Sequence, residues 1–291
     1  MRKKRASTTA KIVTLFRALA DGGATSVPDF HDPFSAALLG PGFRMLQRFV
    51  ERRLRRMTPE KRAVAIQQLD ALPIRVAVID AELMAQVATG CRQVVILGAG
   101  FDTRAYRLPL DGVTVFEVDH PATQAEKRSR VAALPPAKAR LVWTAVDFER
   151  DSLAERLAAA GHDGDLPTVW IWEGVVMYLA DPAVRATLNA IQIRSGPGST
   201  LVLSYHEPGE QRGIRRLILA SVGEPQLGLR TQAEMQALVV EAGLTIRADL
   251  GMTEQATRVG ASVPNSLLAR VQRILIAGDS VGSRSAPANQ S

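Results

Sequence analysis

Three acidic residues stand directly after short apolar runs and are the residues best placed to do chemistry. They are Asp119 after VTVFEV, Asp147 after RLVWTAV and Glu173 after TVWIW. Ahead of them, Gly98–Gly100 ends the run QVVIL. If the runs are strands of an open parallel sheet, the glycine turn and the acids share the edge where such sheets bind ligands. The pattern therefore predicts one ligand site at this edge.

The spacing between the turn and the first acid favours a nucleoside. Asp119 lies 19 residues beyond Gly100, where a carboxylate can accept both hydrogen bonds of a ribose diol. A dinucleotide-binding turn has a third glycine where Thr103 stands, which counts against a bound pyrophosphate. Asp147 can accept from an adenine amino group. Two alternatives stay open: Asp119 caps the helix that begins at Pro121, and Asp147 belongs only to a turn.

Glu173 lies among large apolar residues in VWIWEGVVMYL. An unpaired buried carboxylate is costly, so this acid must be paired or functional. A cationic ligand would supply the partner, and an ion pair with Arg75 is the alternative. A ligand that combines adenosine with a positive charge but has no pyrophosphate is S-adenosylmethionine.

Seven apolar, β-rich runs alternate with helical stretches in the second part of the chain. Near-continuous apolar strands separated by helices predict an α/β fold with a mostly parallel, Rossmann-like seven-stranded sheet that is covered on both faces. We expect the last two strands to pair like a hairpin. We expect helices near 121–133, 151–160, 182–194 and 231–242, the last opened by a capping box from Thr231 to Glu234. The expected strands are 93–98, 113–118, 140–146, 168–173, 199–205, 244–250 and 271–277.

Residues 1–90 are predicted to form a helical N-terminal lid. Helical patterns cover about 43–57, 59–69 and 74–89, and we expect Pro73 to separate the last two. Residues 91–278 would form the core that carries the sheet. The small polar residues of 279–291 are predicted to be disordered.

Charge and composition argue against several classes of protein. The net charge of +7 is confined to residues 1–75, which hold 15 Lys or Arg against 6 Asp or Glu, and no aromatic residues for base stacking lie between the arginines of ERRLRRM. Nucleic-acid binding is therefore the weakest of our alternatives. One cysteine and four histidines argue against a disulfide and a metal site. With no secretory or membrane-spanning apolar run, we expect a cytoplasmic protein; its oligomeric state stays open.

Several motifs together resemble one family. VVILGAGFDTRAYRL, FEVDHP, VDFER and WEGVVMYL, in that order, are similar to the leucine carboxyl methyltransferase-like family of S-adenosylmethionine-dependent O-methyltransferases. HDPF at 31–34 and GEP at 223–225 extend the match. The resemblance implies a class I methyltransferase sheet with a helical N-terminal lid.

The resemblance also implies roles for individual residues. Arg75 would pair with the cofactor carboxylate, Asp119 with the ribose, and Asp147 would lie near the adenine. Asp102 and Arg104 of GAGFDTR would shape the loop, with substrate contact as an alternative for Arg104. The cofactor-binding residues that it implies are Arg75, Gly98, Ala99, Gly100, Asp119, Asp147, Phe148 and Glu173.

The resemblance implies in-line transfer of a methyl group to a carboxyl or hydroxyl oxygen of a small molecule. A carboxylate needs no general base, whereas a hydroxyl would need one, for which His206 is the candidate. Tyr178 is expected to line the acceptor pocket. The arginine-rich lid suggests an anionic acceptor. An NAD-dependent oxidoreductase is the main alternative, because that fold also places a glycine turn and an acid at these positions.

Overall fold

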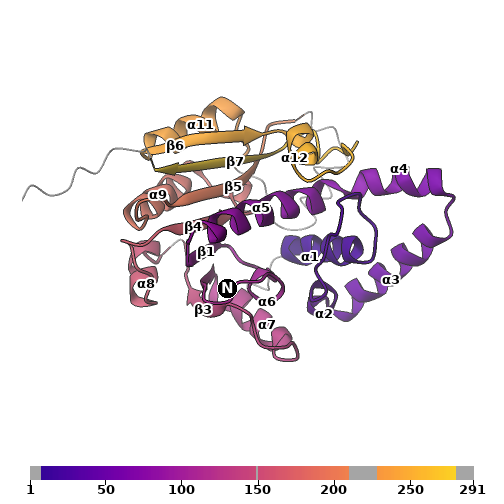
Figure 1. The fold of residues 1–291 in the computed structure, drawn as a ribbon, viewed down its shortest axis with the longest axis horizontal. Coiled ribbons are helices and arrows are strands. Elements are labelled where there is room, and N and C mark those ends of the chain that lie inside the picture. The colour runs from indigo at the N-terminus through magenta and orange to yellow at the C-terminus, as the bar shows by residue number, and fades with distance from the viewer. Residues whose placement is uncertain (1–7, 149, 210–227, 280–291) are drawn as a thin grey trace, which may run out of the picture.

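The structure is a computed structural model that describes residues 8–148, 150–209 and 228–279 (Figure 1). Its centre is one sheet of seven strands in the order β3-β2-β1-β4-β5-β7-β6. Only β7 runs antiparallel to its two neighbours. Every predicted strand is present, with its bounds within two residues of those expected. The strands are β1 Gln93–Leu97, β2 Thr114–Asp119, β3 Arg140–Ala145, β4 Thr168–Trp172, β5 Thr200–His206, β6 Leu244–Leu250 and β7 Gln272–Asp279.

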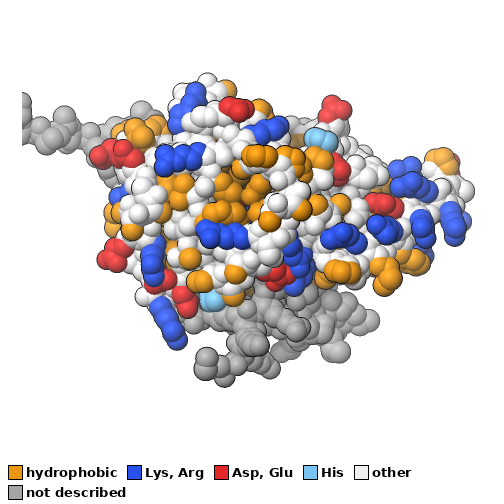
Figure 2. Space-filling model, turned by 90° about the horizontal axis from the view of Figure 1, so that it is seen from below, with side chains coloured by type: hydrophobic (Ala, Val, Ile, Leu, Met, Phe, Trp, Pro, Cys, Tyr) orange, Lys and Arg blue, Asp and Glu red, His pale blue; other side chains and the backbone are white. Residues whose placement is uncertain are grey.

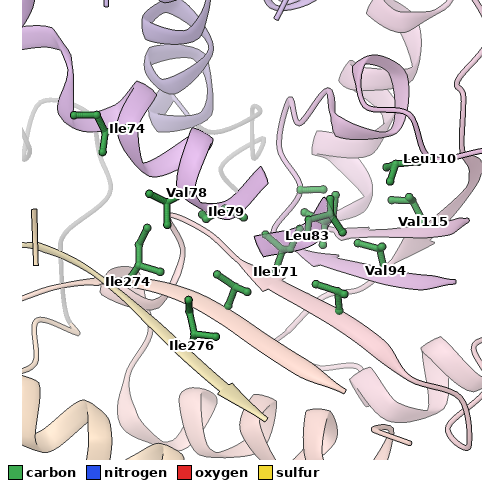
Figure 3. Packing of buried hydrophobic residues seen from close by; sticks show 14 of the residues in the cluster. Ile74, Val78, Ile79, Leu83, Val94, Leu110, Val115, Ile171, Ile274 and Ile276 are labelled. Atoms are coloured by element: carbon green, nitrogen blue, oxygen red, sulfur yellow. The ribbon is translucent and has the colours of Figure 1, made fainter. Parts of the chain in front are cut away.

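Alternate residues of most strands enter two separate apolar clusters, one on each face of the sheet. On one face, Val94 and Ile96 of β1 pack with α5, α6 and α12. Figure 3 shows this face, with Ile74, Val78 and Leu83 of α5 lying over the strands. On the other face, Val95 and its neighbours pack with α8, α9 and α11. These helices are α5 Ala71–Ala88, α6 Arg104–Arg107, α12 Met252–Arg258, α8 Leu153–Ala159, α9 Asp181–Ile193 and α11 Gln232–Glu241.

Strand order reverses at β1, which pairs in parallel with β2 on one side and β4 on the other. The turn after β1 leads into α6, β2 leads into α7 Pro121–Val131, and β4 leads into the short 3-10 helix η1 Val176–Tyr178. The predicted capping box at the start of α11 is also present, with Thr231 and Glu234 bonded to each other's backbone N–H. The ligand edge expected from the sequence therefore forms between β1, β2 and β4.

Pro73 does not separate two helices, contrary to our prediction. The break falls at Asp70, between α4 Pro59–Leu69 and α5, and Pro73 is the third residue of α5. A proline fits there because the first-turn N–H groups of a helix have no intrahelical acceptor. Asp70 is fully buried and accepts hydrogen bonds from Thr25 Oγ1 and Ser26 N, which tie the junction to the segment after α1.

The N-terminal helices fall into two groups. Leu15 and Leu19 of α1 form a separate apolar cluster with Leu39 and Leu54, whereas α5 belongs to the core of the sheet. The boundary predicted at residue 90 therefore does not coincide with a change in packing. In Figure 1, α3 and α4 extend away from the sheet. The helices outside the sheet core are α1 Thr8–Asp21, α2 Ser35–Leu38, α3 Pro41–Arg55 and α4.

Two expectations fall outside the described residues: the GEP motif at 223–225 and nearly all of the predicted disordered tail at 279–291. Across the described part of the chain, no helix has both the length and the apolar character needed to cross a bilayer. Nor do the described residues bring three or more His, Cys, Asp or Glu together as a possible metal site.

Candidate functional site

A cavity of about 280 Å³ lies at the carboxyl ends of β1, β2 and β4. Its floor is the turn Gly98–Asp102, its sides are Asp119 and the segment Glu173–Val175, and α1 supplies a further wall. These segments are far apart in sequence but meet where the strand order reverses. This is the edge at which open α/β sheets bind ligands.

The turn after β1 needs glycine at two positions. Gly98 and Gly100 have φ values of +67° and +49°, in the left-handed region that residues with a Cβ disfavour. A Cβ on Gly98 would lie 2.4 Å from Val175 Cγ2, and one on Gly100 would lie 3.2 Å from Ala10 Cβ. Glycine is therefore required at Gly98 and Gly100 both by the backbone conformation and by the close approach of neighbouring side chains, whatever ligand the cavity holds.

The Asp119 carboxylate is fixed by two backbone N–H groups. Its Oδ2 accepts from Gly100 N at 2.6 Å, and its Oδ1 accepts from His120 N at 2.6 Å. Burial raises the pKa of Asp119, although these hydrogen bonds oppose the shift. Asp119 does not cap α7. That role belongs to His120, whose Nδ1 accepts from Ala122 N at 3.2 Å. Asp119 thus faces the cavity as an oriented acceptor.

Arg75 and Glu173 form an ion pair in the wall of the cavity, with 2.9 Å between Nε and Oε1. Both side chains are almost fully buried, and Arg75 Nη1 also donates to Gln272 Oε1 at 3.3 Å. Burial alone would raise the pKa of Glu173, but Arg104 and Arg75 outweigh it and hold that pKa below its usual value. The ion pair weighed as an alternative role is therefore present, and it presents both charges to the cavity.

Behind this pair lies a buried network of charges that continues to α1. Arg104 bridges Glu173 Oε2 at 2.8 Å and Asp80 Oδ1 at 2.6 Å, and its backbone N–H donates to Asp102 Oδ1 at 2.7 Å. Arg104 holds the pKa of Asp102 at about 2, although burial opposes this shift. The network joins the residues Arg17, Arg75, Arg104, Arg107, Asp32, Asp80, Asp102 and Glu173.

Arg104 is not among the residues that line the cavity. Its side chain is 1% exposed and is held by three acids. This geometry agrees with the loop-shaping role expected for GAGFDTR and gives no support to substrate contact by Arg104.

Helix α1 contributes residues that the sequence analysis did not single out. Ala10, Val13, Thr14 and Arg17 follow helical spacing and line the cavity. The Arg17 guanidinium donates to the carbonyl of Phe101, in the turn after β1. The sequence analysis predicted that residues 1–90 form a helical lid, but not which residues of α1 face the cavity.

The structure brings together most of the predicted site residues, but not all. Tyr178 lies in the wall, where its hydroxyl donates to Thr9 Oγ1 at 3.5 Å. Two residues are not among those that line the cavity: Asp147, whose backbone N–H donates to Asp151, and His206, which is buried at the end of β5. The predicted residues that do line it are Arg75, Gly98, Ala99, Gly100, Asp119, Phe148, Glu173 and Tyr178.

The family model described as leucine carboxyl methyltransferase matches residues 10–192. The chain belongs to this family. A relative from Mycolicibacterium paratuberculosis, provisionally named an S-adenosyl-L-methionine-dependent methyltransferase, is 36% identical over 201 residues. The match covers 68% of this chain and 66% of the relative, so the chain spans just under two thirds of that protein's length.

Solved structures place this leucine carboxyl methyltransferase family member in the class I methyltransferase fold. A DUF574 family protein from Streptomyces avermitilis superposes with a TM-score of 0.56 at 16% identity, covering 94% of this chain and 98% of that one. The [4+2]-cyclase SpnF superposes with a TM-score of 0.50 at 14% identity, covering 74% of this chain and 83% of SpnF. At such identities, the likeness to these solved structures supports the fold alone. The resemblance of the sequence motifs to the leucine carboxyl methyltransferase family is confirmed by the match to the family model.

Proposed function

We propose that this protein is an S-adenosylmethionine-dependent O-methyltransferase that acts on a carboxyl or hydroxyl group of a small molecule. The observation that carries the proposal is the cavity itself, where Asp119 and the Arg75–Glu173 pair face one space beside the glycine turn. An oriented carboxylate suits a ribose diol. An adjacent arginine and glutamate suit the carboxylate and amino group of an amino acid. The donor and acceptor set therefore fits both ends of S-adenosylmethionine.

Bound S-adenosylmethionine would supply a methyl group on a positively charged sulfur. The task of the chain is then to align the acceptor with that methyl and to exclude water. Val13 and Ala10 of α1, together with Phe148 and Val175, give the cavity apolar walls. Gly98 and Gly100 let the turn after β1 lie close to Val175 and Ala10, which also line the cavity.

The choice between a carboxyl and a hydroxyl acceptor depends on whether the site has a base that can remove the hydroxyl proton. A carboxylate reacts without a base, whereas a hydroxyl must lose its proton. In the wall, His120 Nδ1 is engaged by the backbone of α7, and Tyr178 bonds to Thr9. A carboxylate acceptor is therefore the simpler proposal. An anionic acceptor and a cytoplasmic location remain predictions from composition.

Fold alone does not decide the reaction, since the [4+2]-cyclase SpnF has a similar fold. Calorimetric titration with S-adenosylhomocysteine, NAD and a short RNA separates our proposal from the alternatives. We expect only S-adenosylhomocysteine to bind. If it does not bind, the proposed cofactor is wrong, and binding of NAD in its place would favour the oxidoreductase.

The role of Asp119 is tested with the same ligand. Asp119→Ala should weaken S-adenosylhomocysteine binding by about 1–3 kcal/mol, the range for a lost hydrogen bond to a charged group. Asp111→Ala removes an exposed acid outside the cavity and is the matched control. If the two variants bind S-adenosylhomocysteine with equal affinity, Asp119 does not contact the ligand. Screening carboxylic acids and phenols for methylation by the wild-type protein would then identify the acceptor.

A further inference from the structure

The helices α3 and α4, residues 41–69, form an arm that carries much of the protein's positive charge. This arm holds eight Lys or Arg and two Glu, a net charge of +6 in a chain whose total is +7. In Figure 1 the arm projects from the body on the side away from the sheet. Figure 2 shows Lys and Arg side chains gathered at that end of the molecule, with hydrophobic side chains among them.

The arm exposes large apolar side chains in addition to those it uses for packing. Its inner surface, with Leu54 buried and Val50 half-buried, packs against α1. Met45 and Phe49 are nevertheless 71% and 60% exposed on α3, and Val64 is 60% exposed on α4. Exposed apolar side chains that gather on one outward face are a feature of surfaces that bind partners.

Arginines and apolar residues alternate on the outward face of α3. Met45 and Phe49 are four residues apart, and Arg48 and Arg52 follow each of them by three, so all four lie on neighbouring positions of one helix face. Both arginines are exposed. Among the described residues, neither has an ion-pair partner, whereas Arg55 pairs with Glu51. The outward face therefore presents unpaired positive charge and apolar surface together.

We propose that the α3–α4 arm docks onto an anionic lipid surface. Basic helices with large apolar side chains bind membrane interfaces because arginines contact anionic headgroups while apolar side chains enter the region below them. A second copy of the chain fits less well, since two arms of charge +6 would repel. Nucleic acid would engage the arginines but would leave Met45 and Val64 in water, and Phe49 is the single outward aromatic residue of the arm.

Docking would bring the cavity close to the lipid surface. Helix α1 lies between the two, since Leu15 and Leu19 pack in the arm's cluster while Val13 and Arg17 line the cavity. The inference does not depend on the proposed methyl transfer, because it concerns a surface on the other side of α1.

Flotation with vesicles tests the proposal on the full chain. The wild-type protein should float with vesicles of phosphatidylcholine and phosphatidylglycerol, but not with vesicles of phosphatidylcholine alone. Arg48→Gln with Arg52→Gln should weaken binding about 25-fold, at about fivefold per arginine near an anionic surface. Met45→Ser with Phe49→Ser should also weaken it, and these exposed substitutions should leave the unfolding temperature unchanged.

Matched controls lie outside the arm, in α12 and in the segment between α12 and β7. Arg258→Gln with Arg270→Gln removes the same charge from exposed positions outside the arm, and Leu267→Ser removes an apolar side chain that is 59% exposed. Both controls should retain most of the binding. If the two arginine pairs weaken flotation equally, or if wild type does not float with the anionic vesicles, the arm is not a lipid-docking surface. Loss of binding to a short RNA in the arm variants, without vesicle binding by wild type, would favour nucleic acid.

Discussion

Replacing Gly98 by alanine should destabilise the protein through two separable effects. The φ of +67° costs a residue with a Cβ about 1–2 kcal/mol. The new Cβ would also lie 2.4 Å from Val175 Cγ2, and overpacking of this kind costs about 1–3 kcal/mol. We therefore expect Gly98→Ala to lower the free energy of unfolding by about 2–5 kcal/mol, measured by urea denaturation.

Two further variants separate these effects. Gly112 has a φ of +76° and no atom within 4 Å of an added Cβ, so Gly112→Ala measures the cost of backbone strain alone. Val175→Ala removes the clashing methyl group. Added to Gly98→Ala, it should recover the overpacking part, which gives a favourable coupling of about 1–3 kcal/mol in a double-mutant cycle. If Gly98→Ala is no worse than Gly112→Ala, or if the coupling is zero, the close approach to Val175 does not constrain the turn.

Two other predictions concern buried ionisable groups. Lys127 and Glu117 form an ion pair in which both side chains are 1% exposed. Lys127→Met should therefore lower the free energy of unfolding, measured by urea denaturation, by about 3–5 kcal/mol because it leaves Glu117 unpaired, and adding Glu117→Leu should restore much of that loss. Equal stability of the single and double variants would contradict this. Burial, helped by Arg194, lowers the pKa of His162 to about 4 from 6.5. Because the unfolded chain then binds the proton first, stability should fall by about 2 kcal/mol as the pH drops from 7 to about 5. His162→Phe should remove this part of the pH dependence, and an unchanged pH profile would show that His162 is not its source.

The sheet was predictable because its signal repeats. Most strands are short apolar runs that contribute side chains to both faces of the sheet, and helical stretches separate these runs along the chain. The position of Pro73 was not predictable in the same way. A proline interrupts a helix interior but fits its first turn, and only the buried Asp70, bonded to Thr25 and Ser26, shows where α5 begins.

The sequence predicted which edge of the sheet carries the site, but not which side chains at that edge reach the cavity. A residue at a strand end must lie at the ligand edge, and Asp119 and Glu173 do face the cavity. His206 also ends a strand, but β5 lies two strands from β1 and His206 pairs with Gln272 of β7, away from the cavity at the ends of β1, β2 and β4. Asp147 follows β3 by two residues, and its N–H turns toward Asp151. A position at a strand end places a residue at this edge, whereas contact with the cavity depends on which strand the residue ends and on the turn that follows.

The charge network supports a zwitterionic ligand rather than an anionic one. Four arginines and four acids make up the network, so its charges already cancel. Buried ions tolerate little imbalance, because an uncompensated charge in a poorly solvated site is costly. An amino acid end adds one positive and one negative group and preserves the balance, while a pyrophosphate would add only negative charge beside Asp119 and Glu173. Arg75 can bind the carboxylate of the ligand, and Glu173, which pairs with Arg75, can bind its amino group. This pairing favours S-adenosylmethionine over NAD in this cavity.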